Sequence, residues 1–307
     1  MSDQEPDPEE APERQEMIAE PSQRRAPQAL ASGLYVTATP IGNASDLTLR
    51  ALDVLRGADV VLCEDTRVTA KLFAIYGLTT KLMPYHDHNA AEMRPRIMER
   101  LAAGGRIALV SDAGTPLISD PGYKLVRDAV AEGHHVTTLP GASSVMAALT
   151  LAGLPTDRFF FAGFLSAKHE ARLRELTELV GVPGTLVFLE SAPRLAASLK
   201  DMAAALGARE AAVARELTKR FEEVRRGTLV ELAAHYEKAG APKGEIVIVV
   251  GPPVAAAPLC AHEIDAMLEN ALARGSLKDA VAEVVSVTGL PRREIYARAL
   301  ALSEGAD

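Results

Sequence analysis

From residue 33 onward, short apolar runs alternate with amphipathic segments, and this alternation limits the possible folds more than any other feature. Apolar runs typical of buried strands occupy residues 34–40, 59–65, 81–87, 106–112 and 135–140. Amphipathic runs typical of helices occupy residues 44–58, 66–77, 90–105 and 121–133, the first with Asp and Ser near its start. Such alternation predicts a mainly parallel sheet covered on both faces. We therefore expect an α/β domain over residues 33–141.

The pattern changes near Ala142, where strands begin to outnumber helices. Strand candidates lie at 158–164, 184–191, 210–218, 222–232 and 245–251, whereas helical patterns lie only at 169–181 and 194–207. This excess of strands over helices predicts a second, mixed α/β domain over residues 142–253. The Pro- and Ala-rich residues 252–258 are typical of a linker.

Residues 259–307 predict a small all-α module of three short helices. An apolar stripe marks the first helix over 262–273, and Ser276 with Asp279 forms the pattern of a capping box for the second. Gly289 is placed to end the second helix, and Pro291 to begin the third. This spacing is typical of a helix-turn-helix.

Composition limits the cellular setting. Residues 1–32 hold eight acidic and three basic residues and few large apolar side chains, which predicts a disordered acidic tail. The remaining 33 acidic and 30 basic residues give a charge of only −3, which neither requires nor excludes a nucleic-acid partner. Two isolated cysteines, Cys63 and Cys260, favour a reducing cytoplasm. No apolar run reaches the ~18 residues of a membrane span, and the N-terminus lacks a signal-peptide pattern.

Four unusual loops follow predicted strands, at residues 39–43, 63–67, 111–122 and 139–149. Ligands of open α/β sheets bind outside the carboxyl ends of the strands. The loop over 111–122 combines Gly, Pro, Asp and hydroxyl residues, which suits a ligand with carboxylate, hydroxyl or ammonium groups. It is also compatible with a plain surface loop that caps a helix through Asp120.

Seven stretches, taken in order, resemble one family. They cover residues 34–55, 63–67, 111–122, 139–144, 161–165, 190–195 and 215–223. Together they resemble the bacterial small-subunit rRNA 2′-O-ribose methyltransferases of the tetrapyrrole methylase superfamily, over roughly residues 33–302. The first loop, TPIGN, departs from the GxGPG loop of the tetrapyrrole enzymes, which favours the rRNA branch.

The resemblance implies two α/β domains of the class III S-adenosylmethionine methyltransferase type. It implies S-adenosyl-L-methionine in the cleft between them, a homodimer, and methylation of the 2′-hydroxyl of a cytidine in the decoding region of 16S rRNA. The small ribosomal subunit would be the partner, in the cytoplasm and away from membranes. The cofactor-binding residues carried over are Pro40, Asp112, Ala113, Gly114, Ile118, Asp120, Ser143, Ser144, Phe164 and Leu165, with Leu217 and Gly244 as weaker choices. For Ala113, Ile118 and Leu217, ordinary packing is the competing interpretation.

Two charged clusters are candidates for catalysis, because a ribose hydroxyl is a poor nucleophile that benefits from a base or a nearby cation. The stretch 214–223 suggests Lys219 or Arg215 for the RNA phosphate or hydroxyl, with Glu216 orienting them. Glu64, Asp65 and Arg67 are expected to face the same cleft, and the base is left open among these groups. A solvated hairpin with ion pairs is the competing interpretation.

Other polar residues carry weaker hypotheses. The spacing of His86 and His88 suits a metal pair, but no Cys or third His lies nearby in the sequence, so we expect hydrogen-bonding loop residues and no metal. In the C-terminal module, the candidate RNA-binding residues are Arg274, Lys278, Arg292, Arg293 and Arg298. A dimer-contact or stabilising cap is an equal alternative for this module.

Two other functions compete. A precorrin-like tetrapyrrole methyltransferase would be expected to carry a GxGPG first loop and no helical module. A non-catalytic RNA-binding protein would be expected to have lost the Asp, Gly and Ser residues of the loops. The sequence favours the rRNA methyltransferase over both.

Overall fold

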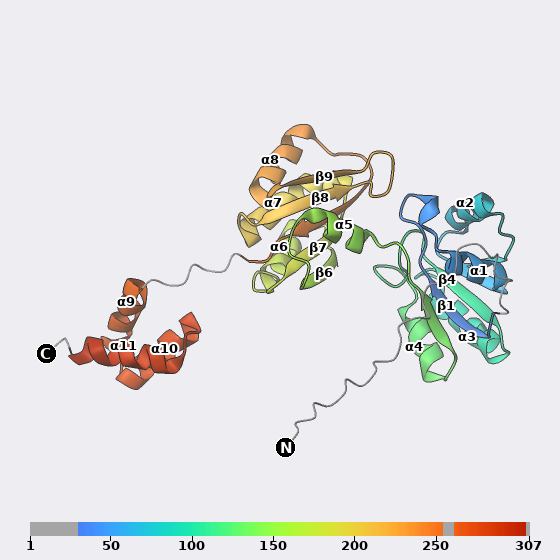
Figure 1. Ribbon diagram of the computed structural model, residues 1–307. Helices are drawn as coiled ribbons and strands as arrows, with labels where there is room; N and C mark the ends of the chain where they lie inside the picture. Colours follow the sequence, from blue (N-terminus) through green and yellow to red (C-terminus); the bar gives the residue numbers. More distant parts are fainter. Residues whose placement is uncertain (1–29, 254–260, 305–307) are drawn as a thin grey trace, which may run out of the picture.

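The computed structural model describes residues 30–253 and 261–304 (Figure 1). The predicted tail over 1–32 and linker over 252–258 therefore lie outside the described residues, apart from residues 30–32 and 252–253. Cys260 also lies outside them, and Cys63 is a buried free thiol. No helix among the described residues is long and apolar enough to cross a membrane.

The first domain is built on a five-stranded sheet in the order β3-β2-β4-β1-β5, in which every described strand pair is parallel. Its strands are β1 (Gly33–Thr37), β2 (Val60–Cys63), β3 (Leu82–Pro84), β4 (Arg106–Val110) and β5 (Val136–Leu139). Helices α1 (Leu49–Gly57) and α2 (Thr66–Tyr76) pack on one face, and α3 (Ala90–Ala102) and α4 (Tyr123–Ala131) pack on the other. The predicted parallel sheet with two covered faces is confirmed.

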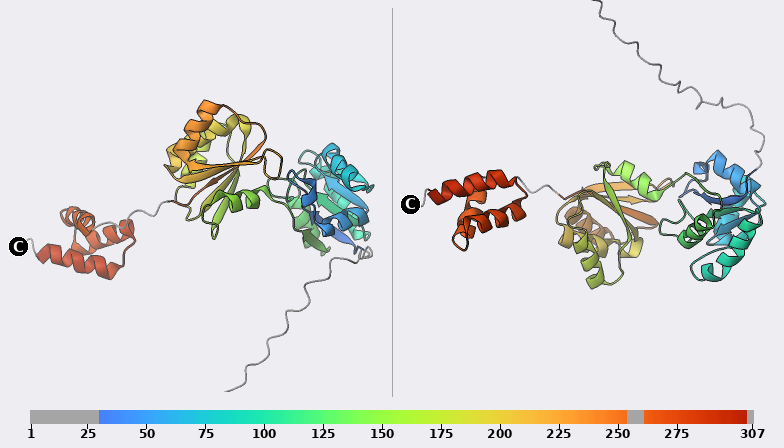
Figure 2. Two further views of the ribbon diagram at one scale, coloured as in Figure 1. Left: turned by 45° about the horizontal axis from the view of Figure 1, so that its top comes forward. Right: turned by 90° about the horizontal axis from the view of Figure 1, so that it is seen from below.

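The second domain contains a mixed sheet in the order β6-β7-β10-β8-β9, with only β6 and β7 parallel. Its strands are β6 (Phe159–Phe164), β7 (Thr185–Ser191), β8 (Glu210–Arg215), β9 (Glu223–Thr228) and β10 (Glu245–Val250). One face carries α6 (His169–Glu178), α7 (Leu195–Leu206) and α8 (Leu229–Ala239), and the other carries α5 (Ser144–Ala152). Figure 2 shows the two domains side by side, joined through the segment between β5 and α5.

Helix α8 was missed by the sequence prediction, which assigned residues 222–232 to a single strand. The strand ends at Thr228, whose hydroxyl accepts a hydrogen bond from the Glu231 N–H. The Glu231 carboxylate accepts one in return from the Thr228 N–H, at 2.8 Å. This capping box starts the helix inside the predicted strand.

Two other helix starts also differ from the predictions. The segment predicted as one helix over 44–58 is a short 3₁₀ turn over Ala44–Asp46 followed by α1, whose N-cap is Thr48. Asp120 does not cap α4, because Gly122 occupies the N-cap position and no side chain bonds there. The Asp120 carboxylate therefore does not cap α4.

The C-terminal module comprises α9 (Ala261–Leu272), α10 (Leu277–Thr288) and α11 (Arg292–Glu304), which confirms the predicted three helices. Ile264, Leu268, Val281, Val284 and Ile295 lie in a hydrophobic core that the three helices form among themselves. Ser276 caps α10, although the Asp279 carboxylate accepts from the Ser276 hydroxyl, at 2.6 Å, rather than from the backbone.

A chain truncated from Pro258 onward should keep both α/β domains folded, because the core of the helical module is separate from the cores of the two sheets. We expect a soluble protein whose thermal unfolding stays cooperative and whose midpoint stays within a few degrees of the full-length value. Calorimetry and circular dichroism provide the measurement. An insoluble truncation, or one without a cooperative transition, would show that the helices stabilise the rest of the chain.

Candidate functional site

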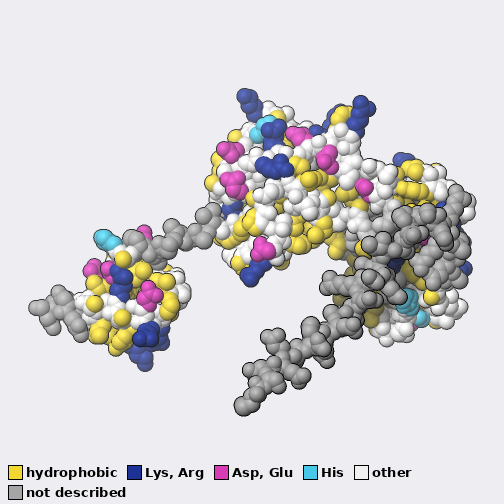
Figure 3. All heavy atoms as spheres, in the orientation of Figure 1, with side chains coloured by type: hydrophobic (Ala, Val, Ile, Leu, Met, Phe, Trp, Pro, Cys, Tyr) yellow, Lys and Arg dark blue, Asp and Glu magenta, His cyan; other side chains and the backbone are white. Residues whose placement is uncertain are grey.

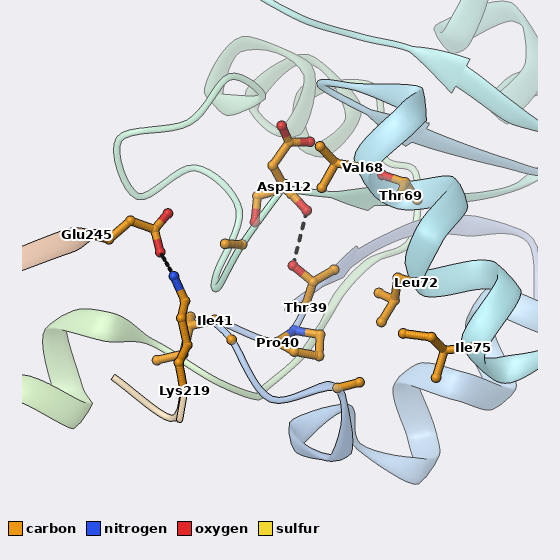
Figure 4. A pocket seen from close by; sticks show the side chains of 14 residues that line it. Thr39, Pro40, Ile41, Val68, Thr69, Leu72, Ile75, Asp112, Lys219 and Glu245 are labelled. Atoms are coloured by element: carbon orange, nitrogen blue, oxygen red, sulfur yellow. Dashed lines mark hydrogen bonds and ion pairs between the residues drawn. The ribbon is translucent and has the colours of Figure 1, made fainter. Parts of the chain in front are cut away.

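The loops after β1 and β4 are joined by backbone hydrogen bonds. Thr39 and Gly114 exchange two of them, with N–O distances of 2.9 and 3.0 Å. The Thr39 hydroxyl also donates to the Ser111 carbonyl at 3.1 Å (Figure 4). Gly114 has a φ of +84°, and its amide takes part in this pair of hydrogen bonds. The backbone conformation alone therefore favours glycine at this position, whether or not a ligand binds beside it.

The loop after β2 is attached to the same place. The Asp65 N–H donates to the Asp112 carboxylate at 3.1 Å, while the Asp65 carboxylate caps α2 and pairs with the exposed Arg67 guanidinium at 2.7 Å. The hydrogen bonds from Arg67 lower the pKa of Asp65 to about 2. Asp65 and Arg67 are therefore paired with each other at the start of α2, and neither lines the two cavities described next.

Two adjoining cavities lie between the domains. The larger, of about 580 Å³, lies between the β4–α4 loop and the strand ends of the second sheet. The smaller, of about 290 Å³, lies between the first loop, α2 and Lys219. Ile41, Asp112, Ala113 and Glu245 line both cavities and form their shared wall.

Most of the predicted cofactor residues meet in the larger cavity. Its lining includes Asp112, Ala113, Ile118, Asp120, Ser144, Phe164, Leu217 and Gly244. Pro40 lines the smaller cavity instead. Ser143 caps α5 by accepting from the Met146 N–H, and Leu165 is buried in the second domain's core. Gly114, Ser143 and Leu165 line neither cavity, and the assignment of a ligand to all these residues stays a prediction.

Several lining residues were missed by the sequence analysis. Ile41 and Ser119 belong to two of the loops that follow predicted strands, whereas Ser191 ends β7 and Ala192 and Pro193 follow it within a family-like stretch. Glu245 begins β10 at the same edge of the sheet. Position at a strand end was the signal that could have found the loop residues, whereas nothing local distinguished Glu245.

Backbone strain gathers in two loops beside these cavities. Among the described residues, only Leu117, Ser119, Glu216 and Thr218 combine a side chain with a positive φ. The first two lie in the β4–α4 loop and the last two in the β8–β9 loop. Such conformations cost about 1–3 kcal/mol each and cluster at ligand sites. The strain thus marks one loop from each domain.

Lys219 links the β8–β9 loop to β10. Its ammonium lies 2.9 Å from a Glu216 carboxylate oxygen and 2.7 Å from one of Glu245. Desolvation lowers the Lys219 pKa, but the hydrogen bonds that the ammonium donates to Glu245 and Glu216 outweigh it, so the net direction is upward. Lys219 therefore keeps its proton at neutral pH and presents a cation to the smaller cavity.

Arg215 is directed elsewhere. Its guanidinium pairs with Glu223 at 2.9 Å and donates to the Lys243 carbonyl at 3.1 Å, in a separate hollow beside Tyr236. It lines neither cavity of the cleft. The structure thus brings Lys219 and Glu216 together and separates Arg215 from them.

Negative charge is concentrated around the larger cavity. Burial, and then the charges of Glu64 and Asp112, raise the pKa of Asp120 to about 6. Burial also raises the pKa of Glu64, with a further upward contribution from Asp112. The carboxylates repel one another, so this part of the cleft favours a bound cation or a retained proton.

The remaining polar candidates differ in their contacts, and the hydrogen bond expected of His86 is not found at its Nδ1, which is buried without a partner among the described residues. His86 and His88 stack edge to face with ring centroids 5.9 Å apart, and the described residues contain no group of three or more His, Cys, Asp or Glu that could hold a metal. In the C-terminal module, Arg298 binds Asp265 across the helices, and Arg274 pairs with Glu283 at 2.9 Å. Lys278, Arg292 and Arg293 are exposed.

Comparison with protein families gives two matches. Residues 33–233 match the model of the Tetrapyrrole (Corrin/Porphyrin) Methylases, and residues 260–303 match that of the RsmI C-terminal HTH domain. The two matches lie on either side of the predicted linker, and the first contains cleft-lining residues of both domains, whereas Gly244 to Val247 lie beyond its end.

Among curated relatives, a Ribosomal RNA small subunit methyltransferase I from Mesorhizobium japonicum is 50% identical over 276 residues, covering 90% of this chain and 94% of the relative. A protein of the same name from Erythrobacter litoralis is 51% identical over 277 residues, covering 90% of this chain and 97% of the relative. Among solved structures, uroporphyrin-III C-methyltransferase from Thermus thermophilus, complexed with S-adenosyl homocysteine, has a TM-score of 0.52. It is 22% identical and covers 71% of this chain and 97% of its own, which shows the shared fold.

Gly42→Ala should destabilise the contact between the two domains. A Cβ atom at Gly42 would lie 2.4 Å from Lys219 Cγ and 2.9 Å from the Leu217 carbonyl oxygen, so the two loops would have to separate. We expect a loss of about 1–3 kcal/mol and a lower midpoint of thermal unfolding. Gly181→Ala is the matched control, because no atom lies within 4 Å of its added Cβ. Equal midpoints for the two variants would contradict the close approach.

Proposed function

The chain belongs to the tetrapyrrole methylases and, within them, to the small-subunit rRNA methyltransferases I, and from this premise we propose its reaction: transfer of a methyl group from S-adenosyl-L-methionine to the 2′-hydroxyl of a cytidine in the decoding region of 16S rRNA. The observation that carries the proposal is the sequence identity of about 50% with named relatives, over nearly their full length. The tetrapyrrole enzyme shares only the fold, at 22% identity, and gives no argument for its own substrate here.

The larger cavity suits S-adenosylmethionine in size and chemistry. Its volume of about 580 Å³ lies within the usual range for small-molecule sites. Ile118 and Phe164 offer apolar surface to an adenine, and Ser144 offers a hydroxyl to polar groups. The repulsion among Asp120, Glu64 and Asp112 would be relieved by the positive charge of a sulfonium.

The bound cofactor supplies an electrophilic methyl group, and the protein's own residues must orient the hydroxyl that attacks it. An in-line displacement needs both partners in a near-attack geometry, and positioning can provide much of the rate gain. The O–C bond forms as the methyl–sulfur bond breaks, and the hydroxyl proton must leave. Lys219 lies beside the shared wall as a protonated amine, so it cannot accept that proton, and we assign it to stabilising the ribose alkoxide that remains when the proton passes to solvent.

The surface supports a homodimer as the working form. Strand β6 lies at an edge of the second sheet, and its Phe159 and Phe160 are 42% and 45% exposed. Figure 3 shows hydrophobic side chains gathered on the surface of the second domain. Exposed aromatic groups at a sheet edge are typical of an interface, and we propose a second copy of this chain as the occupant.

The substrate would be met in the cytoplasm as part of the small ribosomal subunit. We propose that exposed basic residues of the helical module, Lys278, Arg292 and Arg293, bind rRNA phosphates. Arg274 and Arg298 have carboxylate partners within the module, which makes a structural role for them the stronger assignment.

The decisive experiment incubates the purified protein with S-adenosylmethionine labelled in its methyl group and either unmethylated small subunits or a precorrin. The expected result is label on one cytidine ribose of 16S rRNA, located by nuclease digestion and mass spectrometry. Label on the precorrin alone, on a base rather than a ribose, or on neither substrate would overturn the proposal.

Lys219→Ala should lower the single-turnover rate on saturating subunits by about 10²-fold, the usual cost of removing one group that stabilises a developing oxyanion. Its affinity for S-adenosylmethionine should change little, because Lys219 lines only the smaller cavity. Lys238→Ala, on the exposed surface of α8, is the control. A Lys219→Ala rate near wild type would exclude this role.

The affinity for S-adenosylmethionine should rise with pH between 5 and 7.5. A bound cation favours the charged form of Asp120, whose pKa in the free protein is about 6, so binding near pH 5 must displace a proton. One pH unit below that pKa, the affinity should be about tenfold weaker than its high-pH plateau. Titration calorimetry at several pH values provides the measurement.

Two controls isolate this effect. Asp120→Asn should flatten the pH dependence, and S-adenosyl homocysteine, which lacks the sulfonium charge, should show a smaller dependence in the native protein. An affinity that does not vary with pH, or an equal slope for the two ligands, would show that Asp120 does not sense the cofactor's charge.

A further inference from the structure

The smaller cavity has no assigned occupant. It shares Ile41, Asp112, Ala113 and Glu245 with the larger cavity, so the two cavities adjoin along these residues. A methyl group must pass directly from donor to acceptor, so the acceptor must bind in a space that adjoins the donor's cavity. The position of the smaller cavity is therefore that of a site for the methyl acceptor.

One side of the cavity is an apolar face of α2. Val68, Leu72 and Ile75 follow one another at intervals of four and three residues, which places them on one face of the helix. Val68 is 37% and Ile75 65% exposed, so this face is not covered by the core. Figure 4 shows these side chains lining the helix side of the cavity, with Pro40 and Ile41 between them and Lys219.

The polar groups lie at the opposite side and at the shared wall. The Lys219 ammonium is held by Glu245 at 2.7 Å, and Asp112 is fixed by the hydrogen bond from the Asp65 N–H. A ligand bound here would thus have an apolar surface against α2 and hydroxyl or phosphate groups near Lys219. A nucleoside has this division, because the faces of its base are apolar and its ribose is polar.

The volume of the smaller cavity suits one nucleoside. About 290 Å³ is at the lower end of the range for small-molecule sites, too small for a base pair or a tetrapyrrole. Single-stranded RNA allows a base to be turned out of its stack, and enzymes acting on nucleotides bind such bases in pockets. We propose that the smaller cavity receives the target pyrimidine nucleoside, turned out of the rRNA, with its base against α2 and its ribose at the shared wall.

This assignment rests on the proposed function and is tested by altering the helix face. Val68→Trp should fill the cavity, and Ile75→Ser should remove part of its apolar side. On small subunits, we expect single-turnover methyl transfer to fall by about 10²-fold for the first, since misplacement of about 1 Å can cost that much, and by less for the second. Cofactor affinity and thermal stability should stay near wild type.

Matched controls are Val130→Trp and Val130→Ser, which make the same kinds of change at an exposed apolar residue of α4 outside both cavities. They should methylate subunits at the wild-type rate. Wild-type rates for the α2 variants would overturn the assignment and leave the proposed function standing. A loss of cofactor affinity in Val68→Trp would assign the cavity to the cofactor instead. Failure of the native protein to methylate subunits would overturn the proposed function itself.

Discussion

The paired backbone hydrogen bonds between Thr39 and Gly114 are the contact on which the cleft depends. They join the loop after β1 to the loop after β4, two strands that are neighbours in the first sheet. With Asp65 bonded to Asp112, three loops from three adjacent strands are fixed at one edge. A parallel sheet brings the carboxyl ends of its strands together, and these hydrogen bonds fix the loops that follow them as one side of the cleft.

The second domain completes the cleft through charge and strain. Lys219, Glu216 and Glu245 form an ion-pair network at the end of its sheet, and the loop that carries Lys219 holds two side chains at positive φ. Across the cleft, burial and then the neighbouring carboxylates raise the pKa of Asp120. The cleft thus has the Lys219 ammonium, bridged between two carboxylates, on the side of the smaller cavity, and carboxylates that repel one another on the side of the larger one, an arrangement that suits a cationic donor in the larger cavity.

Much of this arrangement could be predicted from the sequence, because long apolar runs and loops at strand ends carry strong local signals. The strands of both sheets and most of the larger cavity's loops were found in this way. Helix α8 was missed because Thr228, Leu229 and Val230 continue the pattern of a strand, and only the cap at Glu231 marks the change. The direction of Arg215 depends on strand pairing, and the place of Glu245 depends on a neighbouring strand distant in sequence, so neither could be derived from residue type.

The close approach of Gly42 to the β8–β9 loop restricts which first and second domains can be combined in one chain. The Asn43 N–H donates to the Thr218 hydroxyl at 3.1 Å, so the glycine-sized gap in one domain and the loop backbone of the other fit as a pair. A hybrid chain could join the first domain of one relative to the second domain of another. It would keep both folds, but it would lose this fit unless the residue at position 42 and the β8–β9 loop were compatible. Each domain thus constrains which versions of the other it can be recombined with.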